Sequence, residues 1–385
     1  MLHGDCGLDM NKEFWKGKKV FVTGHTGFKG GWLSCWLRKL GADVTGYALP
    51  PHTSPSLFAL AHAAEGMNSV YADIRDLGRL QSVMTEHQPE IIIHMAAQAL
   101  VTESYRDPVR TYTTNIIGTM NVMEAVRYIP SVRAVVLITS DKCYENLEWV
   151  WGYRENDSMG GHDPYSSSKG CAELLISAYR DSYFSHQTYE QHGVAIASTR
   201  AGNVIGGGDW SENRLVPDTM KAIMKGDPVM IRNPGAIRPW QFVLEPLRGY
   251  LELAEKLWDD GPQYASAWNF GPNIEQIRPV SWIVENLTTY WSQGARWELD
   301  SATHPHEDHF LKLDCTKAKS LLGWYPRLTL ETILQWIVEW YRAAKDDSDM
   351  RAVTESQIAR YESSASEDIV SSDEETRPIP VATDI

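Results

Sequence analysis

The feature that most constrains the fold is a glycine-rich loop set between a short apolar strand and a helix. Residues 18–23 supply the strand, and Gly24, Gly27 and Gly30 follow it at three-residue spacing. Apolar side chains then recur at helical spacing over residues 32–40. Glycine lets the backbone turn tightly and approach a pyrophosphate, which binds at the N-terminus of the following helix. A tight turn without a ligand is the alternative, but the position between strand and helix favours a dinucleotide-binding unit.

Strands and helices alternate through the first two hundred residues. We expect five further strands, at 43–48, 69–73, 90–94, 134–139 and 193–200, with helices at 77–86, at 109–127 and after Asp163. Strands that alternate with helices in this way predict an α/β fold with a doubly wound, Rossmann-type parallel sheet.

Beyond residue 200, Gly, Pro, Trp and Arg become frequent and the apolar segments shorten, which indicates a smaller C-terminal substrate-binding domain. The expected parts are a leader at 1–17, a dinucleotide-binding domain at 18–202 to which 239–257 return, a substrate-binding domain at 203–238 and 258–345, and a flexible acidic tail at 346–385. The tail is expected because residues 362–385 carry seven acids against one base.

Charge and cysteine usage exclude several classes of protein. The net charge of −14 argues against sequence-independent binding to nucleic acid, which needs a basic surface. No apolar run approaches the length of a membrane span, and the first residues lack the basic and apolar regions of a signal peptide, so we expect a cytoplasmic protein without a membrane partner. The five cysteines are scattered and form no Cys-x-x-Cys, which argues against disulfides and zinc.

The segment 304–309, His-Pro-His-Glu-Asp-His, contains metal-ligand residue types. Pro305 breaks the helical spacing, and nothing elsewhere in the sequence completes a metal site. We therefore expect no metal, and a polar loop or a contact to substrate is favoured.

Polar residues follow the apolar strand at 134–139. Ser140, Asp141 and Lys142 stand at its carboxyl end, which is where open α/β sheets place their sites. A simple hydride-transfer enzyme has no need of an acid and an amine at this point, so the pair indicates additional proton transfers. A structural salt bridge between them is the alternative.

Tyr165 and Lys169 are four residues apart and share one face of a predicted helix. A neighbouring ammonium lowers the pKa of a phenol and can hold a ribose hydroxyl. Ser140 would then hydrogen-bond the substrate hydroxyl that Tyr165 deprotonates. An ordinary pair of surface helix residues is the alternative.

The end of the second strand does not identify the cofactor. An acid there would bind the adenosine ribose hydroxyls and an arginine would accept a 2′-phosphate, but residues 46–50 read Gly-Tyr-Ala-Leu-Pro. The residues alone leave NAD and NADP open. Asp73, at the end of the third strand, is placed to meet the adenine amino group.

Over about residues 18–341 these motifs resemble the extended short-chain dehydrogenase/reductase family. The matching segments are 24–30, His94-Met95-Ala96-Ala97-Gln98, Tyr112-x-x-Asn115-x-x-Gly118-Thr119 and Tyr165-x-x-x-Lys169. Within the family, residues 139–144 are similar to the nucleotide-sugar 4,6-dehydratases, which usually carry an acid pair there. Lys142 replaces the second acid and Glu145 the usual glycine; acid followed by lysine is typical of the subgroup that acts on CDP-glucose, which segments 200–210 and 231–241 also resemble.

The resemblance implies NAD as cofactor and assigns two sets of binding residues. The cofactor-binding set is Gly24, Thr26, Gly27, Phe28, Lys29, Gly30, Asp73, Ile74, Ala96, Ala97, Gln98, Asn115, Thr139, Tyr165 and Lys169. The substrate-binding set is Ser104, Asn203, Arg214, Leu215, Arg232, Arg238 and His306.

The resemblance also implies a reaction, conversion of CDP-glucose to its 4-keto-6-deoxy derivative for deoxysugar biosynthesis, by an internal redox cycle with loss of water. Asp141 would protonate the departing 6-hydroxyl, and Lys142 would either remove the C5 proton or stabilise the enolate. A homodimer, or a dimer of dimers, is implied through the helices that carry Asn115 and Tyr165.

Two other functions stay open on the sequence. One is a 4-epimerase or another nucleotide-sugar dehydratase; Asp141 disfavours the epimerase and Lys142 disfavours the other dehydratases. The second is a non-catalytic NAD-binding sensor or scaffold, which is disfavoured because Tyr165 and Lys169 are both present.

Overall fold

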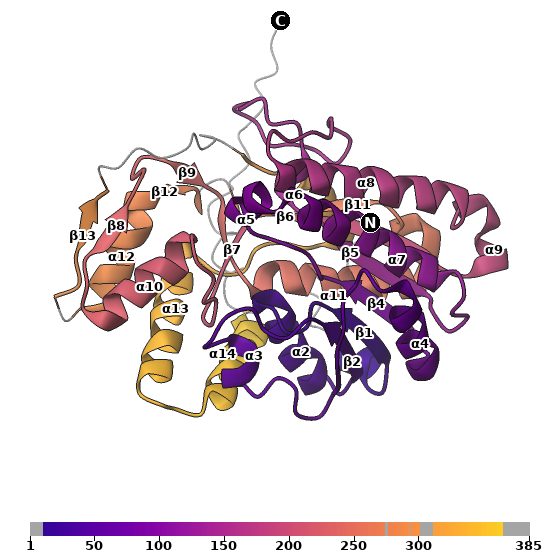
Figure 1. The fold of residues 1–385 in the computed structure, drawn as a ribbon, viewed down its shortest axis with the longest axis horizontal. Helices are drawn as coiled ribbons and strands as arrows, with labels where there is room; N and C mark the ends of the chain where they lie inside the picture. The colour runs from indigo at the N-terminus through magenta and orange to yellow at the C-terminus, as the bar shows by residue number, and fades with distance from the viewer. Residues whose placement is uncertain (1–10, 274–275, 293, 301–310, 365–385) are drawn as a thin grey trace, which may run out of the picture.

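The computed structural model describes residues 11–273, 276–292, 294–300 and 311–364. Its centre is a seven-stranded sheet in which every pairing is parallel, in the order β11-β6-β5-β4-β1-β2-β3 (Figure 1). The strands are β1 Lys19–Thr23, β2 Asp43–Ala48, β3 Asn68–Tyr71, β4 Ile91–His94, β5 Ala134–Ile138, β6 Ala195–Ala201 and β11 Ala267–Phe270. The predicted doubly wound sheet is confirmed, with a seventh strand from the C-terminal half.

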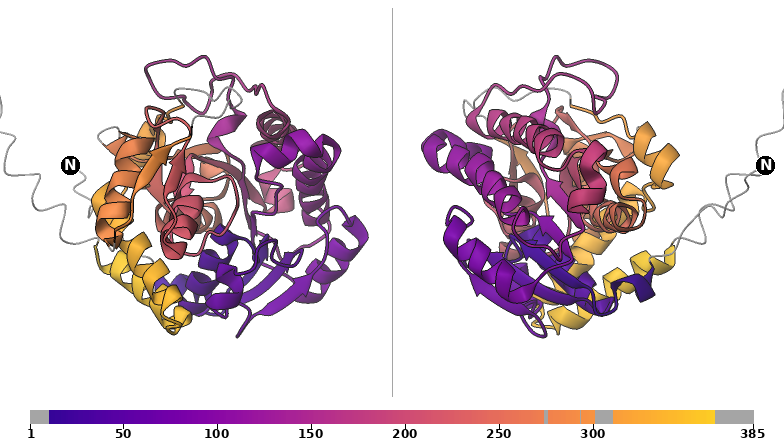
Figure 2. Two further views of the ribbon diagram at one scale, coloured as in Figure 1. Left: turned by 60° about the vertical axis from the view of Figure 1, so that its left-hand side comes forward. Right: turned by 90° about the vertical axis from the view of Figure 1, so that its right-hand side faces the viewer.

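Helices cover both faces of this sheet (Figure 2). On one face, α4 (Leu77–His87), α7 (Gly118–Val126) and α8 (Pro164–Ser182) pack on alternate strand residues such as Ile92 and Val135. On the other face, α2 (Phe28–Lys39) and α11 (Leu244–Asp259) pack on the intervening residues, such as Val22 and Val136. Side chains alternate along a strand, so apolar runs of this kind are buried on both sides.

The predicted helix at 109–127 is not uniform. It consists of α6 (Pro108–Tyr112), a π-helical turn at Thr113–Ile117 and then α7. Single π-helical turns inside helices often occur at functional sites. Here the turn contains Asn115.

The C-terminal half adds a smaller lobe beside the main sheet. Its strands pair two by two: β7 Asn203–Ile205 with β10 Trp240–Phe242, β8 Val229–Ile231 with β13 Trp297–Leu299, and β9 Ile237–Arg238 with β12 Arg278–Pro279. Its helices are α10 Leu215–Lys225, α12 Val280–Trp291 and α13 Leu330–Lys345. Figure 1 shows β8, β13, α10 and α12 gathered on one side of the molecule, away from α4 and α7.

Short elements complete the chain. They are α1 Lys12–Trp15, α3 Leu57–Leu60, α5 Val101–Arg106, α9 Tyr189–His192, the 3₁₀ turns Asp141–Cys143, His186–Thr188 and Gly261–Tyr264, and a π-helical turn at Ala318–Leu322. In the described part of the chain, no helix combines the length and the apolar character needed to cross a membrane.

The predicted acidic tail from residue 346 is wrong over its first part. Residues Met350–Ser363 form α14, and the side chains of Met350, Ile358 and Tyr361 are buried. The Tyr361 hydroxyl donates to the carboxylate of Glu245 (2.6 Å), and its ring meets that of Trp36 edge to face. A helix that buries side chains against α2 and α11 belongs to the folded body; residues 365–385 lie outside the described part.

Candidate active site

The predicted catalytic residues come together at the carboxyl end of β5. Ser140 follows the strand and caps a 3₁₀ turn, its hydroxyl accepting a hydrogen bond from the backbone N–H of Lys142 (3.2 Å). It also donates to the carboxylate of Asp141 (2.9 Å). The exposed fractions of Ser140, Asp141, Tyr165 and Lys169 are 7, 6, 8 and 5%. Lys142 is half-buried.

α8 presents Tyr165 and Lys169 to this strand end. Asp163 caps the helix by accepting from the backbone N–H of Ser166 (2.9 Å), and Pro164 occupies the first helical position. Lys169, one turn after Tyr165, reaches the carbonyl oxygen of Ile138 at the end of β5 (3.4 Å). The predicted shared face of the two side chains therefore points at the strand end.

Burial dominates the protonation of these groups. It raises the pKa of Asp141, against the opposing charge of Lys142. It raises the pKa of Tyr165 to about 12, although hydrogen bonding from Ser140 acts the other way. It lowers the pKa of Lys169 to about 8, and Glu173 opposes that shift. Each charged form is destabilised by loss of water and partly restored by its neighbours.

Sequence reasoning missed a buried ion pair directly behind the site. Glu173, one turn beyond Lys169 on α8, accepts hydrogen bonds from Thr139 (2.5 Å), Ser198 (2.8 Å) and the Arg200 guanidinium (2.8 Å). The spacing of Glu173 from Lys169 was the available signal, since residues four apart share a helix face. The hydroxyl of Thr139, a predicted cofactor contact, is thus committed to Glu173.

Arg200 extends this network toward the segments that follow the site. Its guanidinium donates to the hydroxyl of Tyr144 (2.7 Å) and to the carbonyl oxygen of Glu155 (2.9 Å). The Tyr144 hydroxyl in turn donates to the side chain of Asn269 on β11 (2.8 Å). The ion pair thereby ties α8, β5, β6 and β11 together beneath the catalytic residues.

The glycine loop forms a cradle suited to a dinucleotide. A Cβ at Gly30 would lie 2.1 Å from the carbonyl oxygen of Gly24, and a Cβ at Gly24 would lie 2.7 Å from the nitrogen of Ala96. Gly27 is the N-cap of α2, and no side chain of the described residues caps this end. The open N–H groups and the close backbone approach fit a pyrophosphate at the helix N-terminus.

Lys29, which the sequence placed only in the loop, reaches toward the catalytic groups. Its ammonium lies 5.9 Å from the centre of the Tyr250 ring. Burial, together with the charges of Lys169 and Arg214, lowers its pKa to about 7, while Asp141 raises it. Lys29 thus lies within electrostatic reach of Asp141, Lys169 and Arg214.

The end of β2 carries neither the acid nor the arginine that would distinguish NAD from NADP, and the structure shows which contacts occupy it instead. The ring of His25 lies against Gly46, where a Cβ would come within 2.3 Å of it, and its Nε2 is hydrogen bonded to the hydroxyl of Ser69 (2.7 Å). Burial lowers the pKa of His25 to about 4, so the ring is neutral. The hydroxyl of Thr26 donates to the carbonyl oxygen of Leu49 (2.8 Å).

The adenine-side predictions have mixed outcomes. The carboxylate of Asp73 is held by the Arg75 guanidinium, with a shortest contact of 2.6 Å, and this hydrogen bonding lowers its pKa. Both residues line an open groove with Val109, Thr113 and Ile117. The side chain of Ile74 is buried and packs on Gly118 rather than facing this groove.

The predicted residues after β4 are tied to the catalytic helix through Asn115. Its amide accepts from the N–H of Gln98 (2.9 Å) and donates to the carbonyl oxygen of Gln98 (3.0 Å) and to the hydroxyl of Ser168 (2.8 Å). Ala96 donates its N–H to the hydroxyl of Thr23 (3.1 Å). Asn115 thus fixes the turn that contains Ala97 against α8.

The predicted substrate residues are distributed over both parts of the molecule. Asn203 begins β7 just after Gly202, where a Cβ would lie 3.1 Å from the Asp141 carboxylate. Arg214 caps α10, whose first residue is Leu215, and lies 3.4 Å from Asp209.

Three further predicted contacts differ in position. Arg232 donates to the side chain of Asn213 (3.4 Å), and Arg238 lies in β9. Ser104 is fully buried inside α5, with its hydroxyl donating to Val101 (2.7 Å), so it offers no surface to a ligand in this conformation. His306 lies outside the described residues.

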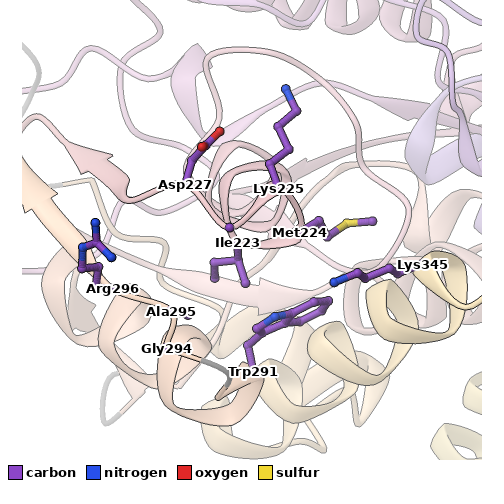
Figure 3. A pocket seen from close by; sticks show the side chains of 10 residues that line it. Ile223, Met224, Lys225, Asp227, Trp291, Gly294, Ala295, Arg296 and Lys345 are labelled. Atoms are coloured by element: carbon purple, nitrogen blue, oxygen red, sulfur yellow. The ribbon is translucent and has the colours of Figure 1, made fainter.

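A cavity of about 200 Å³ lies elsewhere, where α10, α12 and α13 end (Figure 3). Lys225, Arg296 and Lys345 line it, and the ammonium of Lys345 lies 5.4 Å from the centre of the Trp291 ring. Helix C-termini carry partial negative charge, which basic side chains offset. Lys225 and Lys345 are the last residues of α10 and α13 and are explained by these helix ends, whereas Arg296 pairs with Glu298 (3.4 Å). None of the predicted site residues lines the cavity.

Comparisons with known proteins agree with this geometry. The family model described as GDP-mannose 4,6 dehydratase matches residues 21–337. The CDP-glucose 4,6-dehydratase of Salmonella typhimurium is 53% identical over 352 residues, which cover 91% of this chain and 98% of that protein. The dTDP-glucose 4,6-dehydratase of Xanthomonas campestris is 27% identical over 341 residues, covering 83% of this chain and 92% of that one.

Solved structures share the fold. A dTDP-glucose 4,6-dehydratase from Bacillus anthracis in complex with NAD superposes with a TM-score of 0.69 at 21% identity, covering 87% of this chain and 100% of that one. One from Streptomyces venezuelae has a TM-score of 0.70 at 22% identity, covering 86% and 99%. Together with the family match, these results show that the chain belongs to the GDP-mannose 4,6-dehydratase family, within the extended short-chain dehydrogenases/reductases.

Proposed function

We propose that the protein is an NAD-dependent hydro-lyase that converts CDP-D-glucose to CDP-4-dehydro-6-deoxy-D-glucose. The observation that carries the proposal is the Asp141-Lys142 pair at the end of β5, beside Tyr165 and Lys169. The 53% identity to a CDP-glucose 4,6-dehydratase supports it.

The residues divide the proton transfers of the reaction. NAD would be held by the glycine loop at Gly24 and by Lys169, and it would supply a hydride acceptor for C4 of the sugar and a hydride donor for C6. Tyr165 removes the proton of the 4-hydroxyl, and Lys169 stabilises the phenolate and holds a ribose hydroxyl. The ketone at C4 acidifies the C5 proton, which Lys142 removes while Asp141 protonates the departing 6-hydroxyl. Burial raises the pKa of Asp141, which favours the protonated acid that this step needs.

The role of Lys142 can be tested on its own. The variants Lys142→Met and Lys142→Arg should both lose exchange of the C5 proton with deuterium from solvent, because neither side chain can act as a base. If Lys142 instead stabilises the enolate by charge, Lys142→Arg should retain much of the exchange. Near-normal exchange of the C5 proton in Lys142→Met would refute the assignment of Lys142 as the base.

We further propose the division of labour predicted from the sequence. Residues 18–202 with 239–257 hold the cofactor, and 203–238 with 258–345 hold the sugar nucleotide. Arg214, Arg232 and Arg238 supply guanidinium groups for the diphosphate, since planar forks suit phosphate oxygens. The charge of Arg214 already acts on Tyr165 and Lys29, which is consistent with a position at the mouth of the site.

We propose that the protein forms a homodimer, or a dimer of such dimers, through α6, α7 and α8. Apolar side chains stand exposed on these helices and on the π-helical turn between α6 and α7, including Val109 (72% exposed), Leu174 (62%) and Ile117 (39%). Patches of this kind mark interaction surfaces. The variant Leu174→Arg should sediment as a smaller species than the wild type; unchanged sedimentation would exclude α8 from the interface.

One experiment tests the proposed function as a whole. The purified protein is offered CDP-glucose, dTDP-glucose, GDP-mannose and UDP-glucose without added NAD. We expect a 4-keto-6-deoxy product from CDP-glucose alone, formed with the cofactor that the protein retains, and no product with Tyr165→Phe. Inversion at C4 would support the epimerase alternative, and binding without turnover the sensor.

A further inference from the structure

Arg214, one of the arginines proposed to bind the diphosphate, is held by two contacts within the protein. Its Nη1 lies 3.4 Å from the carboxylate of Asp209, and its Nη2 donates to the carbonyl oxygen of Ala99 (3.3 Å). Ala99 lies between β4 and α5, so the guanidinium spans from the start of α10 to the segment that follows β4. The inference drawn from these contacts rests on the proposed function, which makes the guanidinium a ligand for phosphate.

Asp209 is itself fixed at both its side chain and its backbone. The residue is 3% exposed, and one carboxylate oxygen accepts a hydrogen bond from the backbone N–H of Ser211 (3.0 Å). The other carboxylate oxygen faces Arg214. The carbonyl oxygen of Asp209 accepts from the hydroxyl of Tyr341 on α13. A carboxylate held in this way cannot follow the guanidinium toward a ligand.

The segment that leads to Asp209 is packed tightly against α13 and α2. A Cβ at Gly207 would lie 2.2 Å from the ring of Trp340 on α13. The carbonyl oxygen of Gly207 accepts from the indole N–H of Trp32 on α2 (3.0 Å). α10 also packs on α13 (Figure 1). The carboxylate of Asp209 therefore stands on a rigid base, and the helix that begins after Arg214 rests on the same support.

The guanidinium of Arg214 has capacity for a ligand beyond these contacts. The Arg214 side chain is 36% exposed, whereas that of Asp209 is 4% exposed. A guanidinium has five N–H groups in a planar fork, and the two contacts use only one from each Nη. The remaining N–H groups can form the paired hydrogen bonds that phosphate oxygens accept. The carboxylate thus occupies the buried side of the arginine.

We propose that Asp209 is a positioning residue that fixes the Arg214 guanidinium for the diphosphate of the substrate. A long side chain loses rotamer freedom when it binds a ligand, and that loss weakens binding. Asp209 orders the arginine in advance, so the guanidinium meets the phosphate already oriented. Asp209 itself neither touches the substrate nor transfers a proton, and its effect on the reaction passes through Arg214.

The test is a double-mutant cycle of Asp209→Asn, Arg214→Met and the double variant. Asparagine keeps the shape of the side chain and an oxygen for the N–H of Ser211, but it loses the charge. We expect the KM for CDP-glucose to rise about 10-fold in each single variant, the factor that a charge-assisted hydrogen bond contributes, with a much smaller change in kcat. The double variant should have the same KM as Arg214→Met alone.

Competitive inhibition by CDP and by cytidine separates positioning from general damage. In Asp209→Asn the inhibition constant of CDP should rise with the KM, whereas that of cytidine, which lacks phosphates, should match the wild type. Damage to the local fold would weaken both inhibitors and would refute the proposal. Glu298→Gln is the matched control, because it breaks an exposed ion pair of the same 3.4 Å length, with Arg296, and should leave both constants unchanged.

The other outcomes also decide the proposal. Additive losses in the cycle would refute it, because Asp209 would then act independently of Arg214. Tighter binding of CDP by Asp209→Asn would refute it as well, since the carboxylate would be competing with phosphate. Unchanged inhibition by CDP in Arg214→Met refutes it whether or not Asp209→Asn folds. If the wild type turns over a different nucleotide sugar, the proposed function fails, and the same cycle on that substrate still decides the role of Asp209.

Discussion

The ion pair between Glu173 and Arg200 allows a prediction whose magnitude follows from the structure. Both side chains are 4% exposed, and their oxygen and nitrogen atoms are 2.8 Å apart. Replacing Glu173 by glutamine removes the countercharge and leaves the guanidinium buried. Breaking a buried pair from one side costs about 3–5 kcal/mol, because the remaining charge has lost its water without compensation. We expect Glu173→Gln to lower the free energy of unfolding by that amount.

Equilibrium urea unfolding measures this loss, and a double-mutant cycle assigns it. Arg200→Met alone should also be strongly destabilised, because it leaves the buried carboxylate of Glu173 without its countercharge. The double variant should be more stable than the sum of the two single losses predicts, because it leaves no unpaired charge. Glu339→Gln breaks an exposed pair with Arg360 and is the matched control, expected to leave the unfolding midpoint unchanged. Additive losses in the cycle would refute the coupling.

The same variant should alter the pH dependence of catalysis. Burial lowers the pKa of Lys169 to about 8, and Glu173 is the group that raises it against that effect. Without the carboxylate the pKa of Lys169 falls further, so the ammonium is lost at lower pH. The alkaline limb of the kcat profile should then move toward lower pH in Glu173→Gln. An unmoved limb would show that Glu173 acts on stability alone.

Three further predictions concern other parts of the molecule. Burial lowers the pKa of His94 to about 3, so the stability contributed by the neutral imidazole is full above pH 6.5 and is lost as the pH falls. At pH 5 the free energy of unfolding should be lower by about 2 kcal/mol, which urea unfolding should detect in the wild type and not in His94→Gln. Gly46→Ala would place a Cβ 2.3 Å from the His25 ring, so the thermal midpoint and the NAD content of the purified protein should fall, and the double variant with His25→Ala should recover both. Ending the chain before α14 exposes the partners of three buried apolar side chains, including Tyr361, and should cost about 5 kcal/mol in urea unfolding, whereas ending it just after α14 should not.

The central sheet and the catalytic cluster were predictable because their signals are local. Continuous apolar runs mark strands buried on both faces, and the carboxyl ends of parallel strands meet at one edge of the sheet. That rule alone places the loop at Gly24 near Ser140. The four-residue spacing of Tyr165 and Lys169 places both on one helix face. The structure confirms that these two side chains point at the end of β5.

The features that sequence reasoning missed depend on partners distant in the chain. Glu173 and Arg200 are 27 residues apart on different elements. The spacing of Glu173 from Lys169 predicts a shared helix face, but no sequence pattern predicts that Arg200 is its partner. α14 was included in the tail predicted at 346–385 because of the acid-rich segment at 362–385. Its burial depends on Glu245, 116 residues away. His25 was predicted only as part of the glycine-rich loop, and its contact with Gly46 became visible in the fold.

The proposed roles of Asp141 and Lys142 explain why an amine can replace the usual second carboxylate. The charge of Lys142 lowers the pKa of Asp141, so a permanent ammonium would favour the ionised carboxylate over the protonated acid that the leaving group needs. The proposed role as base requires that Lys142 be able to accept a proton when elimination begins. As the C5 proton moves to Lys142 and the Asp141 proton moves to the 6-hydroxyl, the two side chains become an ammonium and a carboxylate. Their attraction therefore appears only as the reaction proceeds, which stabilises the transition state more than the bound substrate.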